Sequence, residues 1–168
     1  SQYPFSSIST IQGKLWQLRR ASPWQHWMNP NTGRINSCQP GYEDLLNQRI
    51  DKVLQDSQKN WWLAGRQGVL RLAYGQRCYQ GFRHDPANPH SLTEGYITFI
   101  FEDRQGMIWF GVTNGVDRFD PRTHQFVHYR FDQSAQYGAA VCIVQDSQGI
   151  LWITAQKGGL FQLDSSQG

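Results

Sequence analysis

An internal repeat, in which a Trp lies six residues after an Asp, limits the possible folds of this chain more than any other feature. The three clear copies are Asp56-Ser-Gln-Lys-Asn-Trp-Trp62, Asp103-Arg-Gln-Gly-Met-Ile-Trp109 and Asp146-Ser-Gln-Gly-Ile-Leu-Trp152. A weaker copy, Thr10-Ile-Gln-Gly-Lys-Leu-Trp16, has Thr in place of Asp. The intervals between the Trp residues are 46, 47 and 43 residues. A nearly constant period of this length indicates a repeat architecture in which each unit is one supersecondary element.

The copy that contains Asp103 and Trp109 predicts four strands joined by tight turns. Its strand segments are rich in aromatic and β-branched residues. Asp103 can accept a hydrogen bond from the backbone two residues on, and Gly106 supplies the positive φ that a turn requires. Asn114-Gly115 is a strong signal for a second hairpin. The predicted strands are residues 96–102, 107–112, 116–119 and 125–131.

Residues 41–56 allow two interpretations. Leu45, Leu46, Ile50 and Val53 lie at helical spacing, so the segment alone would predict an amphipathic helix. The repeat register instead aligns Ile50 and Val53 with strand positions of the next copy. We therefore predict a strand over residues 50–55.

The predicted fold is all-β. Four-stranded antiparallel meanders of roughly 45 residues, stacked radially, are typical of β-propeller blades. The chain of 168 residues would form one partial propeller of about four consecutive blades, at about 1–46, 47–93, 94–138 and 139–168. The last blade is expected to be incomplete, because the chain stops soon after its predicted third strand at 159–163.

Residues 91–121 read Ser91-Leu-Thr-Glu-Gly-Tyr-Ile-Thr-Phe-Ile-Phe-Glu-Asp-Arg-Gln-Gly-Met-Ile-Trp-Phe-Gly-Val-Thr-Asn-Gly-Val-Asp-Arg-Phe-Asp-Pro121. This stretch resembles the two-component regulator propeller repeat. The preceding residues 84–92 resemble the linker between such repeats. The resemblance is strongest over residues 48–164. The chain departs from the repeat pattern at three positions. Lys59 replaces the turn Gly, and Ala64 and Thr154 each replace the Gly two residues after the Trp.

This resemblance implies a function. Such repeats form periplasmic sensor regions of bacterial hybrid histidine kinases and of some diguanylate cyclases, so we expect a periplasmic, non-catalytic module that binds a ligand. The family's propellers have about seven blades, which implies that the chain joins the remainder of a longer sensor or a second copy of itself. An open sheet edge would be the site of that association.

Two other functions remain as alternatives. A propeller enzyme of the streptogramin-lyase type also carries a strand such as Gly149-Ile-Leu-Trp152, but we find no His and Glu set at equivalent blade positions. A scaffold that binds protein through a propeller face is the other alternative. Turnover of a ligand would favour the enzyme, and saturable binding without turnover would favour the sensor.

The repeated Trp and Asp residues are expected to be structural. An indole on an inner strand can pack one blade against the next, and an Asp before a turn can cap that turn. The alternatives are a stacking platform for sugars or bases and a set of metal ligands, whose members would be separated by a whole blade. The residues concerned are Trp16, Trp62, Trp109, Trp152, Asp56, Asp103 and Asp146.

A ligand site, if present, is expected where the loops between the second and third strands meet the long inter-repeat loops. Basic residues recur there, and guanidinium groups bind carboxylate or phosphate oxygens through a planar fork of donors. An anionic or sugar-acid ligand follows from this arrangement, although solvated loop charges would give the same pattern. The candidate ligand-binding residues are Arg20, Arg66, Lys157, Asn114, His84 and His90.

Composition and motif content exclude several functions. Sixteen Lys and Arg against thirteen Asp and Glu give a scattered net charge of +3, which does not favour direct binding of nucleic acid. The longest apolar run, residues 139–144, is too short for membrane insertion. No P-loop, GxSxG, HExxH or Rossmann pattern occurs, so we expect no catalytic residue, metal or cofactor. Cys38, Cys78 and Cys142 fit no zinc pattern and are expected to be small buried hydrophobes, with their oxidation state left open.

Overall fold

The structure is a computed structural model that describes residues 8–11, 14–17, 28–29, 33–34, 36–42, 44–45, 50–76, 78–131 and 137–164; before residue 38 it describes the backbone alone. The described residues are mainly β-strands and turns. The first five strands are short: β1 (Ile8–Ile11), β2 (Lys14–Gln17), β3 (Met28–Asn29), β4 (Gly33–Arg34) and β5 (Asn36–Ser37). β1 pairs with β2, and β3 pairs with β4.

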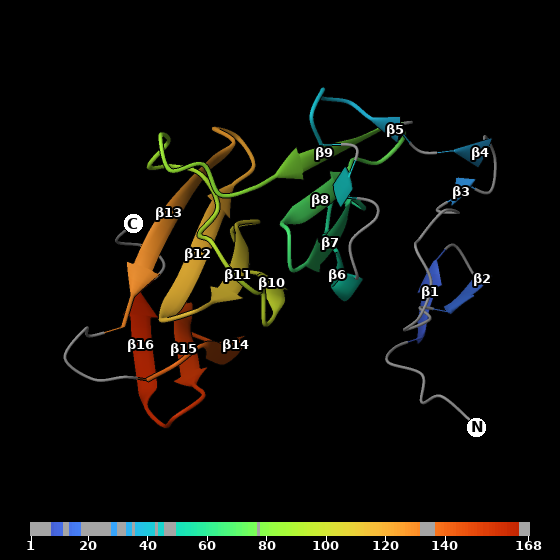
Figure 1. The fold of residues 1–168 in the computed structure, drawn as a ribbon. Helices are drawn as coiled ribbons and strands as arrows, with labels where there is room; N and C mark the ends of the chain where they lie inside the picture. The colour runs from blue at the N-terminus through green and yellow to red at the C-terminus, as the bar shows by residue number, and fades with distance from the viewer. Residues whose placement is uncertain are drawn as a thin grey trace, which may run out of the picture.

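Three larger sheets follow along the chain (Figure 1). The first contains β6 (Ile50–Gln55), β7 (Trp61–Gly65), β8 (Val69–Leu72) and β9 (Cys78–Phe82), with β5 parallel to β9 at its edge. The second contains β10 (Ile100–Glu102), β11 (Ile108–Val112), β12 (Gly115–Asp120) and β13 (Gln125–Arg130). The third contains β14 (Ala140–Gln145), β15 (Ile150–Ala155) and β16 (Leu160–Asp164). These antiparallel meanders confirm the predicted all-β, partial-propeller fold.

The strand predicted over residues 50–55 is confirmed as β6, so the helical interpretation of residues 41–56 is wrong for this part. The predicted strand 96–102 is shorter, because its regular part begins at Ile100. Thr98 N–H donates to the Gly111 carbonyl (2.9 Å), while Gly111 N–H donates to the Phe99 carbonyl (3.1 Å). Two residues therefore oppose one, which is a β-bulge that interrupts the ladder. In the third sheet the last strand is β16, one residue later than predicted at 159–163.

The core lies between successive sheets. The Trp62 ring packs on the following sheet, with its centroid 5.2 Å from that of Phe119 and 5.9 Å from that of Phe110. Trp109 packs in the same way with Leu151 and Ile153 of the third sheet. Trp62 and Trp109 are both fully buried, so each repeated indole fills the space between one sheet and the next.

Each of these indoles is also held by the Asp that precedes it by six residues. In the second sheet, Trp109 Nε1–H donates to Asp103 Oδ2 (2.7 Å). The other carboxylate oxygen, Oδ1, accepts the backbone N–H groups of Gln105 (2.9 Å) and Met107 (2.9 Å). One carboxylate therefore closes the turn and orients the buried indole at the same time.

The same hydrogen bond recurs in the sheets on either side. Trp62 Nε1–H donates to Asp56 Oδ2 (2.9 Å), and Trp152 Nε1–H donates to Asp146 Oδ2 (2.9 Å). The bond from the Trp152 side chain lowers the pKa of Asp146 below its ordinary value of 3.8, against the opposing effect of desolvation. Because the lowered pKa favours the ionised carboxylate in the folded protein, this stabilisation is present above the ordinary pKa and is lost as pH falls through the lowered one.

Lys59 occupies a backbone conformation that favours glycine. Its φ is +66°, whereas the equivalent residues of the next two turns, Gly106 and Gly149, have φ of +79° and +91°. A side chain in this left-handed region costs about 1–2 kcal/mol. We therefore expect Lys59→Gly to raise the free energy of unfolding by about 1 kcal/mol, as measured by urea denaturation.

Gly106→Ala is the matched control. Because open space surrounds Gly106, a loss of stability of similar size in this variant should come from backbone strain alone. Destabilisation by Lys59→Gly would contradict this account.

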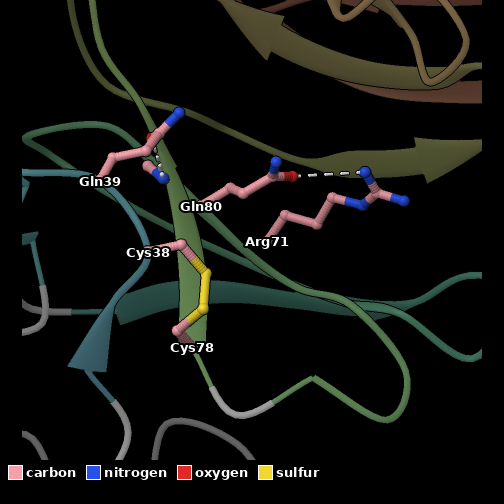
Figure 2. The surroundings of a disulfide bond; sticks show 6 residues. Cys38, Gln39, Arg71, Cys78 and Gln80 are labelled. Atoms are coloured by element: carbon pink, nitrogen blue, oxygen red, sulfur yellow. Dashed lines mark hydrogen bonds between the residues drawn. A yellow bond between two sulfur atoms is a disulfide. The ribbon is translucent and has the colours of Figure 1, made fainter.

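The three cysteines differ from the prediction that all are small buried hydrophobes. Cys38 and Cys78 form a disulfide (Figure 2). Cys142 is free and exposed. The pairing arises because residues 36–37 lie parallel to β9, and Cys38 N–H donates to the carbonyl of Tyr79 (2.8 Å). Cys142 is exposed because it lies on an outward-facing position of β14, at the edge of the third sheet.

Candidate functional site

A polar cavity of about 300 Å³ lies where the end of the first large sheet meets the segment that leads into the second. Three stretches of chain form it: the turn between β7 and β8, the segment after β9 and the segment before β10. Asp44 adds a carboxylate from the chain that precedes β6. The lining residues are Asp44, Arg66, Gln67, Gly68, Arg83, His84, Leu92, Thr93, Glu94 and Gly95.

A close backbone approach shapes this cavity. Gly68 has φ of +141°, and a Cβ on it would lie 2.3 Å from the Phe82 carbonyl oxygen. Only glycine allows the β7–β8 turn to lie so close to the end of β9. Leu92, which lines the cavity, and Leu45, which lies next to Gly68, are both buried and anchor the segments that carry its polar side chains.

The charged side chains of the cavity differ in whether they have ion-pair or hydrogen-bond partners. Arg83 forms an ion pair with Asp44 through one of its terminal nitrogens, while its buried Nε has no hydrogen-bond partner among the described residues. Arg66 and Glu94 are exposed, and no hydrogen bond or ion pair joins either of them to another described residue. The cavity therefore offers one guanidinium and one carboxylate to a small polar molecule.

The structure brings two of the predicted ligand-binding residues together. Arg66 and His84 both line the cavity, and His84 Nδ1 lies 3.1 Å from the carbonyl oxygen of Leu92. The predicted residue Arg20 lies outside the described residues. Sequence reasoning did not identify Arg83 and Glu94 as site residues, although Arg83 directly precedes the singled-out His84 in the sequence.

The other predicted ligand-binding residues do not line this cavity. His90 lies against β13, where its carbonyl accepts the N–H of Phe126 (3.0 Å). Asn114 adopts a left-handed conformation in the β11–β12 turn (φ +61°). Lys157 lies in the β15–β16 turn, where its N–H donates to Tyr137 (2.9 Å). The loops between second and third strands thus carry basic groups at separate places, because each belongs to a different sheet.

A buried carboxylate beside the cavity is a second feature that sequence reasoning missed. Asp117 on β12 is fully buried and accepts hydrogen bonds from Thr93 N–H (2.7 Å) and Thr93 Oγ1–H (2.8 Å). Arg130 Nη1 also donates to Asp117 Oδ1 (3.1 Å). The repeat register contained a signal for this site, since the equivalent residue of the preceding repeat, also eight residues after the Trp, is Leu70.

The described residues hold neither a cluster of metal ligands nor a membrane-spanning helix. No three His, Cys, Asp or Glu side chains in this part of the chain converge as metal ligands. Nor does any helix within the described ranges have the length and apolar character needed to cross a membrane.

Successive antiparallel sheets, each carrying the Asp-to-indole hydrogen bond, define this chain as a tandem-repeat β-propeller protein. Residues 91–114 match the sequence profile of the family described as "Two component regulator propeller". This match confirms the resemblance inferred from the sequence over residues 91–114, which include β10 and β11 of the second large sheet. No curated protein sequence matches the chain.

Solved structures extend the similarity beyond one repeat. The extracellular domain of the hybrid two component system BT4673 from B. thetaiotaomicron matches 71% of this chain with 25% identity and a TM-score of 0.59. A second structure of the BT4673 extracellular domain matches 95% of this chain with 23% identity and a TM-score of 0.60. This chain covers 17% and 22% of those two chains, so it spans about a fifth of their length.

A streptogramin B lyase structure is also similar. It matches 94% of this chain with 15% identity and a TM-score of 0.56, and this chain covers 53% of it. At that identity the similarity shows a shared fold and nothing about chemistry.

Proposed function

We propose that this chain is a ligand-binding, non-catalytic part of a bacterial signal-transduction sensor. Its similarity to the extracellular domain of a hybrid two component system supports the sensor class. The observation that carries ligand binding is the cavity, in which the Arg66 guanidinium has no partner among the described residues. In this proposal the chain supplies part of a larger propeller. Its share is the four predicted blades, at about 1–46, 47–93, 94–138 and 139–168.

The ligand is an acidic sugar or another small carboxylate-bearing molecule. Arg66 can bind a carboxylate through two parallel N–H donors. Glu94 can accept hydrogen bonds from hydroxyl groups. The cavity volume of about 300 Å³ is at the small end of the range for ligand sites, which fits one or two sugar rings.

The proposed location is the periplasm. The Cys38–Cys78 disulfide supports it, because such bonds persist in oxidising compartments and are rare in the cytosol. The neighbours that share this fold at 25% and 23% identity are extracellular domains.

The proposed partner is the remainder of a longer sensor chain or a second copy of this one. In the first two large sheets the repeated Trp is fully buried by the following sheet, whereas Trp152 of the third sheet is only half-buried. On the same face, 54% of Val144 and 63% of Leu160 are exposed. By the register of the other sheets, this face is where a further sheet would pack.

Replacement of Arg66 tests the ligand site. We expect a uronic-acid disaccharide such as digalacturonate to bind the wild-type protein, and Arg66→Ala to weaken that binding about tenfold, since a hydrogen bond between charged groups contributes roughly 1.5–3 kcal/mol. Isothermal titration calorimetry measures both affinities. A neutral disaccharide of the same size should bind more weakly than digalacturonate to the wild-type protein.

Arg122→Ala is the matched control for this experiment. Arg122 is also an exposed arginine, with 79% of its side chain accessible, but it lies in the β12–β13 turn and does not line the cavity. Its loss changes the net charge equally and should leave the affinity unchanged. Equal binding of acidic and neutral disaccharides, or an unchanged affinity in Arg66→Ala, would overturn the proposal.

A further inference from the structure

A side chain of the second large sheet is hydrogen-bonded to a turn of the first. Glu102 is the last residue of β10, and Ser57 follows Asp56 in the β6–β7 turn. The backbone N–H of Ser57 donates to Glu102 Oε2 (2.7 Å), and the Ser57 hydroxyl donates to Oε1 (2.6 Å). One serine therefore supplies a donor to each oxygen of one carboxylate, and hydrogen bonds to a carboxylate are stronger than those between neutral groups.

The second and third sheets share the same contact with one bond fewer. Gln145 is the last residue of β14, and its Oε1 accepts the backbone N–H of Arg104 (2.9 Å) in the β10–β11 turn. Arg104 has no hydroxyl, and the amide nitrogen of Gln145 donates to the Gly149 carbonyl (3.0 Å). In both places the residue directly before a turn Asp binds the residue directly after the preceding turn Asp. The residue after the turn Asp therefore sets how many donors this contact offers.

The turn of the third sheet carries the donor half of this contact without an acceptor. Ser147 follows Asp146 as Ser57 follows Asp56, and Ser147 is exposed. Neither its N–H nor its hydroxyl has a hydrogen-bond partner among the described residues. The Asp146 carboxylate instead accepts the N–H groups of Gln148 (2.9 Å) and Ile150 (3.0 Å). Both donors of Ser147 are thus available to a further group.

The face of the third sheet that carries Trp152 is uncovered, whereas the equivalent faces of the first two sheets are covered. Val69, Val116 and Leu160 occupy equivalent positions, each paired with the residue two after the repeated Trp. Val69 and Val116 are 0% and 1% exposed, because the following sheet packs against them. Leu160 is 63% exposed. A unit like the second or third sheet would therefore continue the existing packing.

We propose that Ser147 and this face bind a further repeat of the same kind, in which the residue before the turn Asp is a glutamate. Ser147 offers the two donors that Ser57 offers to Glu102. A carboxylate supplies one oxygen to each donor, whereas a glutamine has a single acceptor oxygen. The inference specifies the chemistry of the partner, and it rests on the proposed function only in taking that partner to be the remainder of a longer sensor.

A second copy of this chain matches the uncovered face less well. At the equivalent position of its first large sheet it presents Gln55, which is exposed and carries an amide instead of a carboxylate. The face of that sheet opposite Trp62 is also occupied in part by Tyr42 and Leu45 of the same chain. A following repeat has neither disadvantage.

Two matched serine substitutions test the contact in the chain as it is. Ser57→Ala removes the hydroxyl donor to Glu102, and we expect the equilibrium constant for unfolding to rise about fivefold, as for the loss of one exposed hydrogen bond. Ser147→Ala removes a hydroxyl that has no partner among the described residues and should leave the constant unchanged. Urea denaturation measures both. Equal effects of the two substitutions would overturn the proposal, because Ser147 would then not be the free half of the contact.

An extended chain supplies the proposed partner. Residues 121–164 are repeated once after Asp164, which adds an outer strand to β16 and one further sheet. The copied residue at the Gln145 position is made Glu in one version and Ala in the matched control. We expect the N–H of Ser147 to exchange with solvent about tenfold more slowly in the Glu version than in the Ala version, as measured by nuclear magnetic resonance.

Each outcome of this experiment decides the proposal. Equal exchange of Ser147 N–H in the two versions would overturn the assignment of a glutamate. An extension that leaves the outer amides of β16 unprotected would show that the face does not take a further repeat. A dimer of the unextended chain that Ser147→Ala dissociates, as measured by sedimentation, would identify a second copy as the occupant and overturn the proposal. Digalacturonate is not used, so failure of the proposed ligand class would not change any of these results.

Discussion

Trp109→Ala is expected to lower the free energy of unfolding by about 3–5 kcal/mol, the range for removing a large aromatic side chain from a core. Trp109 is fully buried between the second and third large sheets, in one hydrophobic cluster with Leu151 and Ile153. The substitution leaves a cavity there and also removes the N–H donor to Asp103, which is itself buried. Urea denaturation followed by tryptophan fluorescence and circular dichroism measures the change.

Two variants separate the parts of this effect. Trp109→Phe keeps most of the ring but orphans Asp103 Oδ2, so we expect a loss of about 1–3 kcal/mol. Trp152→Ala removes the equivalent indole of the third sheet, which is only half-buried, and should cost less than Trp109→Ala. If Trp152→Ala and Trp109→Ala cost the same, packing between sheets would not be the role of the repeated Trp.

Loss of the Cys38–Cys78 disulfide is expected to lower the free energy of unfolding by about 3–4 kcal/mol. The bond joins residues 40 apart, and the entropy of closing a loop of that length in the unfolded chain accounts for an effect of this size. It also attaches residues 36–39 to β9, where the Gln39 side chain accepts the N–H of Gly81 (3.3 Å). Figure 2 shows this segment beside β9.

Urea denaturation of the Cys38→Ser, Cys78→Ser double variant measures this loss, and the wild type with a reducing agent should behave like the variant. Cys142→Ser is the control, because Cys142 is exposed and unpaired, and it should leave stability unchanged. A double variant as stable as the wild type would show that the disulfide adds nothing to the folded state.

Much of the fold was predictable because the repeat gives the same information several times. The helical spacing of residues 41–56 favoured a helix locally, yet the register with the next repeat predicted β6 with its observed bounds. Repetition also identified Lys59 as a substitute for the turn glycine, and its backbone does adopt the glycine conformation. For the site, the alignment of basic loop residues singled out Arg66, and the inter-repeat loop singled out His84; both line the cavity.

The sequence by itself determined the all-β repeat, because alternating apolar positions, turn residues and the Asp-to-Trp interval act over a few residues and do not depend on distant neighbours. Only the tertiary structure decided which distant residues meet. Cys38 pairs with Cys78 because residues 36–37 add to the edge of β9, and Asp44 forms an ion pair with Arg83 just after the end of β9. Asp117 is satisfied only where Thr93, His128 and Arg130 converge on it. Those contacts depend on how loops of different length close in space, and nothing in the local pattern of residues specifies that.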